Sequence, residues 1–385
     1  MTIRKIVFWG LFSIFFLFPL WMFLMWEFQN GSKLDVFILD KTVNNTLYQE
    51  HRSLTWILQY DKYLKSDGKL YNLTKDYFGF FPQKNNKYEI HDLSKYSEGE
   101  IDELANKYQV YYSADTYGVY FNEWYHRNDI NEHSGKIYGG MINNDFLLMK
   151  KMAEQNKLVI CEYNTIATPT PKNIRSKVEN MFSFQWSGWA GRYFFSLDTI
   201  VNSELPRWVI RLYKKQYHTN WTYTGSGIVF VNESDSIVIL ENKKDLLYEV
   251  PQIITNKYGK EKFELPDTMN YPYWFDICTS DKVNRMMAYY KINTTENGDS
   301  ILSANGISSI FPAVLENTQY RFYYFAGDFS DNFVRMRLSK LRGVDHLRSL
   351  MINPYDLSDR SRFFWEYYVP LVRTILKDYS KEINQ

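Results

Sequence analysis

Three acidic residues in the first half of the chain each follow a short, mostly apolar run. Asp40 comes after LDVFIL, Asp115 after QVYYSA and Glu162 after KLVIC. If these runs are parallel strands of one sheet, their carboxyl ends meet along a crevice, where open α/β sheets bind ligands. Two carboxylates in different surroundings can divide acid and base roles, or they can bind a divalent cation. Asp115 and Glu162 are therefore candidate catalytic residues and Asp40 a candidate binding residue. The competing interpretation is structural, because strand-end carboxylates often cap the next helix or loop.

Polar and aromatic residues near these positions extend the candidate site. Segments 115–126, 186–193 and 327–332 are richer in aromatic, glycine and charged residues than an ordinary loop. Glycine allows a ligand or an aromatic ring to approach the backbone closely, so one interpretation is a platform for sugar rings. Packing of Trp against a glycine corner explains the same pattern. The candidate binding residues are Thr116, Tyr117, Trp124, Asn164, Trp186, Trp189, Arg192 and Asp328.

Signatures of several enzyme and binding classes are missing. The sequence has no G-x-S-x-G or G-x-C-x-G elbow, no phosphate loop and no H-E-x-x-H motif. The six His show no metal spacing, although His126 and His133 could share a helical face, so no metal and no cofactor is expected. With 45 basic and 44 acidic residues, the net charge of +1 gives no argument for nucleic acid. Cys161 and Cys278 are too few for a disulfide scaffold; two buried thiols are favoured, and one long-range disulfide stays open.

The hydrophobic pattern predicts an α/β fold with a mostly parallel sheet. Predicted strands alternate with predicted helices up to about residue 185, which requires right-handed crossovers between parallel strands. Later segments predict a hairpin, two more strands and a terminal amphipathic helix. The expected strands are 34–39, 76–81, 109–113, 157–161, 228–231, 237–240, 286–292 and 321–325, and the expected helices 47–65, 99–107, 143–155, 172–182, 205–217 and 361–379.

The N-terminus predicts a membrane anchor. Residues 6–26 carry no charge, and Arg4 and Lys5 precede them. A helix of this length is about 30 Å long, enough to cross the hydrocarbon core, and no small-residue cleavage site follows. The positive-inside rule then places the N-terminus in the cytoplasm and the bulk of the chain outside the cell membrane. We expect one transmembrane helix in contact with the lipid bilayer.

These observations divide the chain into six parts. They are a cytoplasmic N-terminus at 1–5, the transmembrane signal anchor at 6–26 and a linker at 27–33. An α/β domain at 34–200 is followed by an α+β insertion or second subdomain at 201–317. Residues 318–385 contain a late strand that could return to the first sheet, and the terminal helix.

The order LDVFILD, DYFGFFP, YYSADTYGVY, IYGGM, KLVICEYN and GWAGRYF, with YYFAGDFSDN near the end, resembles a class I glutamine amidotransferase-like domain. The resemblance covers about 34–200 and rejoins at 318–335. It implies a flavodoxin-like α/β fold of the kind found in membrane-anchored bacterial proteins and in accessory domains of carbohydrate-active enzymes. The catalytic Cys elbow of that family and its downstream His-x-Glu pair are absent here, so amidotransferase activity is not expected.

Three functions are consistent with this pattern. The first is a non-catalytic extracytoplasmic accessory subunit for synthesis or export of surface polysaccharide, with a polytopic membrane protein such as a glycosyltransferase as partner and glycan as ligand. The second is a glycan hydrolase or esterase that uses Asp115 and Glu162. Carboxyl groups about 5–5.5 Å apart would indicate a retaining and 6.5–9.5 Å an inverting hydrolase. The third is a solute-sensing module with a small closed pocket.

Overall fold

The computed structural model describes residues 3–125 and 134–384, so His126 and His133 lie outside the described residues. Its centre is a ten-stranded mixed sheet in the order β14-β13-β16-β17-β18-β9-β6-β2-β4-β5. The five strands from β18 to β4 run parallel to one another, which gives the predicted α/β core. These strands are β2 (Val36–Asp40), β4 (Phe78–Pro82), β6 (Val110–Asp115), β9 (Leu158–Cys161) and β18 (Phe322–Phe325).

Antiparallel strands extend the parallel core on both sides. The strand β5 (Tyr88–His91) pairs with β4 at one edge. On the other side four strands continue from β18, and all of them come from the region between 250 and 320. They are β13 (Gln252–Thr255), β14 (Thr268–Asn270), β16 (Asn284–Lys291) and β17 (Ile310–Asn317).

A second, antiparallel sheet of four strands has the order β12-β11-β10-β15. The long strand β10 (Phe184–Phe194) lies at its centre and is bulged between Trp186 and Ala190. Residues 201–317 therefore contribute strands to both large sheets. The remaining strands are β11 (Gly227–Asn232), β12 (Ile237–Glu241), β15 (Trp274–Ser280), and the short pairs β1 (Ser32–Lys33) with β3 (Tyr63–Leu64) and β7 (Val119–Tyr120) with β8 (Lys136–Tyr138).

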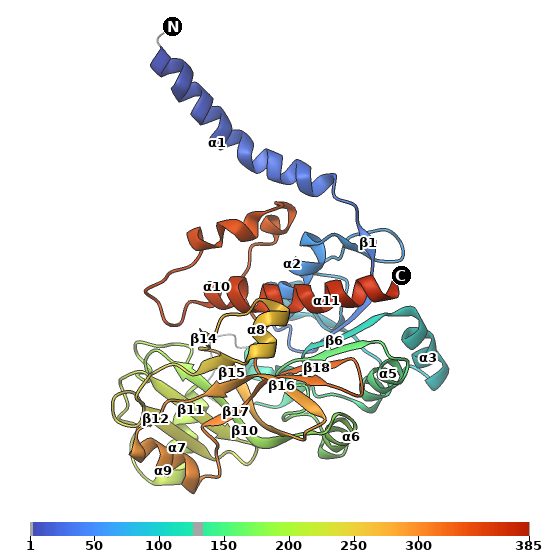
Figure 1. Cartoon of the computed structure of the whole chain (residues 1–385). Helices are drawn as coiled ribbons and strands as arrows, with labels where there is room; N and C mark the ends of the chain where they lie inside the picture. Colours follow the sequence, from blue (N-terminus) through green and yellow to red (C-terminus); the bar gives the residue numbers. More distant parts are fainter. Residues whose placement is uncertain (1–2, 126–133, 385) are drawn as a thin grey trace.

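Helices cover both faces of the ten-stranded sheet (Figure 1). α2 and α11 lie on one face, and α3, α5 and α6 on the other. Sequence signals set several ends; α3, for example, begins with a capping box in which Ser97 and Glu100 satisfy each other's backbone N–H groups. The helices are α2 (Arg52–Tyr60), α3 (Glu98–Lys107), α4 (Phe121–Tyr125), α5 (Asn143–Glu154), α6 (Lys172–Phe182), α7 (Arg207–Tyr217), α8 (Lys257–Phe263), α9 (Glu296–Ala304), α10 (Arg360–Phe363) and α11 (Val369–Ile383), with short turns η1 (Lys84–Asn86), η2 (Met336–Lys340), η3 (Val344–Leu350) and the π-turn η4 (Phe364–Tyr368).

The C-terminal helix closes the core by contacts with the first part of the chain. On α11, Arg373 makes a two-pronged ion pair with Asp61, with both N–O distances 2.7 Å, and a third contact of 3.0 Å with Asp345. The Tyr60 hydroxyl also donates to Asp345 at 2.6 Å. These bonds tie α11 to the end of α2 and to η3.

The N-terminal helix α1 (Ile3–Glu27) extends away from the body of the molecule (Figure 1). Its last turns are not free, because Met22 and Trp26 are buried against the domain and the N–H of Arg342 donates to the carbonyl of Met22 at 3.0 Å. The sequence predicted a transmembrane span at 6–26. In the part of the chain that the structure describes, no helix is long and apolar enough to cross a membrane. The transmembrane span predicted at 6–26 is therefore not found among the described residues.

Candidate functional site

The parallel strands bring Asp40 and Asp115 together at the carboxyl edge of the sheet. They are the last residues of β2 and β6 and are paired in register. Both side chains are buried. Asp40 accepts hydrogen bonds from the N–H of Thr42 at 3.0 Å and lies 2.5 Å from Nδ1 of His51. The strand-end position that the sequence indicated is thus a buried Asp–His contact.

Asp115 ends β6, and Asn164 contacts its side chain from the loop after β9. The backbone N–H of Tyr117 donates to Asp115 at 2.6 Å, and the side-chain amide of Asn164 reaches its other oxygen at 3.5 Å. Thr116 donates through Oγ1 to the carbonyl of Asn164 at 2.7 Å. Burial, together with the neighbouring charge of Asp40, raises the pKa of Asp115 to about 8. These surroundings favour the neutral form of the Asp115 carboxyl group.

Glu162 has the same edge position beyond β9 but faces the interior. The hydroxyl of Tyr112 donates to one of its oxygens, and the N–H of Ser330 donates to the other at 2.8 Å. Tyr112 in turn lies 2.7 Å from the hydroxyl of Tyr368 in η4. Burial raises the pKa of Glu162 to about 8. Both oxygens of this fully buried carboxyl group are thus occupied by the protein.

Three further acidic residues, which the sequence reasoning did not single out together, complete a carboxylate cluster. Burial, followed by the charges of Asp40, Asp331 and Asp115, raises the pKa of Glu50. Burial, followed by Asp331, Asp115 and Glu162, raises the pKa of Asp328. Like charges in one poorly solvated region favour shared protons. Within 3–125 and 134–384, no group of three or more His, Cys, Asp or Glu has the arrangement of a metal site. The carboxylate cluster is Asp40, Glu50, Asp115, Glu162, Asp328 and Asp331.

A cavity of about 520 Å³ opens next to the carboxylate cluster; we call it the carboxyl-edge cavity. It collects side chains from the loops after β2 and β6, from β10, from the segment before α7 and from α10. Its lining combines amides, aromatic rings and charged groups. The residues are Asn44, Asn45, Tyr117, Tyr120, Asn122, Glu123, Ser134, Arg192, Ser203, Glu204, Pro206, Trp208, Asp331 and Arg360.

Two arginines and three carboxylates, those of Glu123, Glu204 and Asp331, line this cavity. Arg192 forms an ion pair with Glu204, and Arg360 lies 3.7 Å from Asp331 and 3.9 Å from Glu204. The guanidinium of Arg360 stacks on the ring of Tyr273, 4.5 Å from its centre. One donor and one acceptor are left over: Nε of Arg192 and Oδ1 of Asp331 are buried and have no hydrogen-bond partner among the described residues. Both side chains also line the cavity, which therefore combines donor and acceptor groups.

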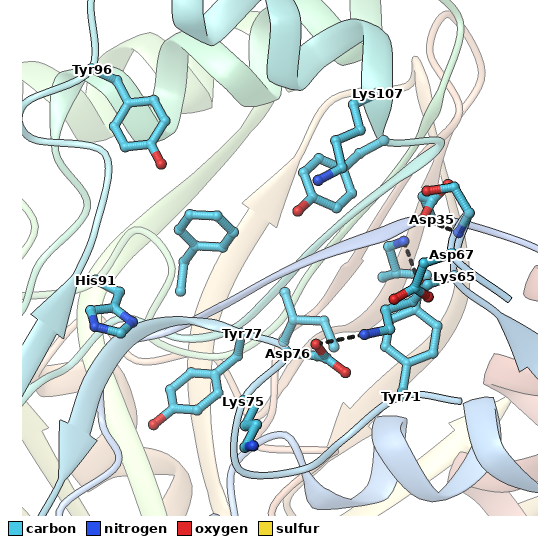
Figure 2. A pocket seen from close by; sticks show the side chains of 15 residues that line it. Asp35, Lys65, Asp67, Tyr71, Lys75, Asp76, Tyr77, His91, Tyr96 and Lys107 are labelled. Carbon is cyan, nitrogen blue, oxygen red and sulfur yellow. Dashed lines mark hydrogen bonds and ion pairs between the residues drawn. The ribbon is translucent and has the colours of Figure 1, made fainter. Parts of the chain in front are cut away.

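A second cavity, of about 470 Å³, lies beside β2 and β4 and has a different character. Figure 2 shows Lys65 directed at Asp76, and the two form an ion pair of 3.0 Å. Asp35 accepts from the N–H of Ser66 at 2.9 Å, and Asp76 also accepts from the N–H of Asn72 at 2.6 Å. Because these acidic groups already have protein partners, this cavity makes a weaker ligand site than the carboxyl-edge cavity.

The predicted aromatic platform is not assembled at the carboxyl edge. Trp124 belongs to a small separate core with Phe80 and donates to the carbonyl of Asn86 at 2.9 Å. Trp186 stacks over Arg175 at 5.0 Å and lines a different, smaller cavity, and Trp189 is buried. The bulge of β10 separates these residues from Arg192. Of that segment, only Arg192 reaches the carboxyl-edge cavity.

Several residues of the site carried no local signal. Glu50 and His51 precede α2, and Asp331 and Arg360 come from distant loops, so only the fold brings them to Asp40. Asp276 on β15 accepts from the hydroxyl of Tyr324 at 2.8 Å and from the N–H of Asn164 at 3.2 Å, and burial raises its pKa to about 7. The alternation of β15 would have predicted that the side chain of Asp276 points inward, but not that it contacts Tyr324 and Asn164.

Comparison with known proteins does not assign this chain to a family. No family model matches the chain, and no curated protein matches it. A solved structure from Bacteroides uniformis, described as a thuA-like protein, matches with 10% sequence identity and a TM-score of 0.35, over 82% of this chain and 90% of that chain. The chain itself has a mixed α/β fold with a five-stranded parallel core.

Proposed function

We propose that this protein is a non-catalytic, membrane-associated accessory subunit that binds a glycan in the carboxyl-edge cavity. The observation that carries the proposal is the mixed lining of that cavity, which joins aromatic rings and amides to charged side chains that are paired with one another. A sugar hydroxyl donates and accepts at once, so a single ligand class can pair with the donors and the acceptors of this lining.

The rest of the lining supports a sugar ligand. Tyr117, Tyr120 and Trp208 supply flat apolar faces with polar edges, and the amides of Asn44 and Asn122 both donate and accept. The two arginines are matched by Glu204 and Asp331, so the cavity has no surplus of positive charge that would favour a phosphate. A neutral, hydroxyl-rich glycan fits this balance.

We propose a non-catalytic role because the candidate catalytic groups are buried and Glu162 is hydrogen-bonded within the protein. Glu162 has both oxygens bound within the protein and does not line the cavity. Cys161 is buried, and burial raises the pKa of its thiol, which disfavours the thiolate nucleophile. An amidotransferase-like fold without its nucleophile is consistent with a binding role.

The membrane part of the proposal rests on α1. Its exposed side chains include Phe8, Trp9, Phe18 and Trp21, and a lipid bilayer or an apolar helix of a polytopic partner would remove them from water. A membrane glycosyltransferase or exporter of surface polysaccharide is the partner we propose. Gentle detergent extraction followed by mass spectrometry tests this point: a stoichiometric polytopic partner is expected, and a chain that is extracted alone contradicts it.

Glycan binding is tested with a panel of immobilised bacterial oligosaccharides. We expect retention by the wild-type chain and about a tenfold weaker affinity for Tyr120→Ala, which corresponds to about 1.4 kcal/mol. Tyr96→Ala, in the cavity of Figure 2, is the matched control and should bind like wild type. No retained glycan, or equal effects of both substitutions, would contradict the proposal.

One observation favours the second candidate, a glycan hydrolase or esterase. Burial raises the pKa of both Asp115 and Glu162 to about 8, and a general acid that works near neutral pH needs a pKa in this range. If the cavity hydrolyses a glycan or its ester, Asp115→Asn should abolish turnover and retain ligand binding. Turnover by Asp115→Asn at the wild-type rate would exclude this assignment.

A further inference from the structure

The segment that follows the last strand carries a line of exposed cations. In η2 and at the residue after it, the side chains of Met336, Leu338 and Leu341 pack against the core. Basic residues before, within and after this stretch are exposed to solvent. We call the exposed residues Arg335, Arg337, Lys340 and Arg348 the basic face.

The basic face adjoins the point where α1 meets the domain (Figure 1). Lys340 lies over the ring of Trp26 at 5.5 Å, and Lys62 lies over the same ring at 5.1 Å. Large apolar side chains are exposed on the same segment, with Phe333 at 63% and Leu350 at 82%. Basic side chains, the indole of Trp26 and exposed apolar side chains thus lie together near the C-terminal end of α1.

The cations of the basic face are available to a partner. None of the four forms an ion pair with a residue that the structure describes. Their neighbours differ: Arg342 and Arg373 are both paired with Asp61, and Arg373 also with Asp345. Within this segment Arg342 is thus neutralised by an ion pair, whereas the four residues of the basic face keep their positive charge without a paired carboxylate among the described residues.

We propose that the basic face docks onto the anionic phospholipid headgroups of a bilayer with which α1 associates. This inference rests on the membrane association proposed above and adds a lipid preference to it. Charge complementarity selects the occupant, since cations near a membrane surface are attracted to anionic lipid over a Debye length. Trp at the headgroup level and apolar side chains beside the cations are typical of interfacial segments. Docking would hold the domain against the bilayer and fix which side of it faces a membrane partner.

Vesicle flotation with the full chain tests the inference. Wild-type protein is mixed with phosphatidylcholine vesicles, or with vesicles that also contain about 30% phosphatidylglycerol to give them a negative surface potential. The variant Arg335→Gln, Arg337→Gln, Lys340→Gln, Arg348→Gln removes the basic face. Four exposed lysines on the opposite side of the molecule, in the region of α7 and β12, provide the matched control: Lys214→Gln, Lys215→Gln, Lys243→Gln, Lys244→Gln (Figure 1).

We expect wild-type protein and the control to bind the anionic vesicles at least about tenfold more tightly than the neutral ones, with the gain lost at high salt. The basic-face variant should bind both vesicles equally, at the neutral-vesicle level. Equal wild-type affinity for the two vesicles would overturn the inference and point to an acidic protein surface as occupant, while the membrane association itself would stand. Absence of binding to either vesicle would overturn that association as well.

Discussion

Two neighbouring tyrosines on β6 differ in what their hydroxyl groups contact. Tyr112 donates to the buried Glu162 and contacts Tyr368, whereas the hydroxyl of Tyr111 has no hydrogen-bond partner among the described residues. Both rings are fully buried. Successive residues of a strand face opposite sides of the sheet, so the two rings are buried in different surroundings. Removing the hydroxyl group from each ring in turn therefore shows how much the hydrogen bond of Tyr112 contributes to stability.

We expect Tyr112→Phe to lower the free energy of unfolding by about 1–3 kcal/mol, because it leaves the carboxyl group of Glu162 without its side-chain partner. Tyr111→Phe removes a buried hydroxyl with no partner, and its effect should be within about 0.5 kcal/mol or slightly stabilising. Urea unfolding of both variants measures the difference. Equal destabilisation would show that the Glu162 contact contributes nothing of its own.

At the scale of the elements, the position of Asp40 depends on how closely β4 approaches β2. Gly79 in β4 has φ +149°, and a Cβ built there would lie 1.6 Å from the carbonyl oxygen of Asp40. Only glycine permits that approach. The pairing of the two strands at the site thus requires a residue with no side chain.

We expect Gly79→Ala to destabilise the protein by about 3 kcal/mol or more and to weaken glycan binding, because the strands must separate at Asp40. Gly99 in α3 is the matched control, since nothing lies within 4 Å of its built Cβ. Gly99→Ala should stabilise the protein by up to about 1 kcal/mol, as alanine favours a helix. Thermal unfolding with glycan titration measures both, and a Gly79→Ala variant with wild-type stability would contradict the argument.

The sequence predicted most local elements of the first half, because their hydrophobic periods are clear. The segment expected as a helix at 172–182 is α6 (Lys172–Phe182), and the strand expected at 157–161 is β9 (Leu158–Cys161). The expected helix at 47–65 is shorter, since α2 spans Arg52–Tyr60 and Lys62 has a positive φ. The strands β15 and β17 were not predicted, because runs that are buried on both faces have no regular alternation. The strands β10, β13 and β14 were not predicted either.

At the scale of the whole molecule, the buried carboxyl groups make stability depend on pH. The pKa of Asp115 and of Glu162 is about 8 in the folded protein and near 4 when unfolded. Between these values the folded state binds more protons, so stability falls as the pH rises. The contribution is fully present below about pH 4 and is lost as the pH passes about 8, with a slope of at most about 1.4 kcal/mol per pH unit for each group.

We therefore expect the wild-type protein to be more stable at pH 5.5 than at pH 8.5. Glu162→Gln stays neutral at every pH and should reduce this difference. Glu316 pairs with Lys262 and Arg285, and its pKa is lowered, so Glu316→Gln is a control that should leave the slope unchanged in this range. Urea midpoints across the pH range measure the slopes; stability that rises with pH would contradict the buried protons.

The sequence by itself determined the alternation of strands and helices and the strand-end positions of Asp40, Asp115 and Glu162, because periodicity and turn residues act over a few neighbouring positions. It also indicated an apolar N-terminal helix, but not that Met22 and Trp26 pack on the domain. Tertiary structure decided that Glu162 turns inward to Tyr112, and that Arg192 and Arg360 join Asp331 at the cavity. Such meetings depend on which strands become neighbours and on burial, which are properties of the whole chain and leave no local pattern.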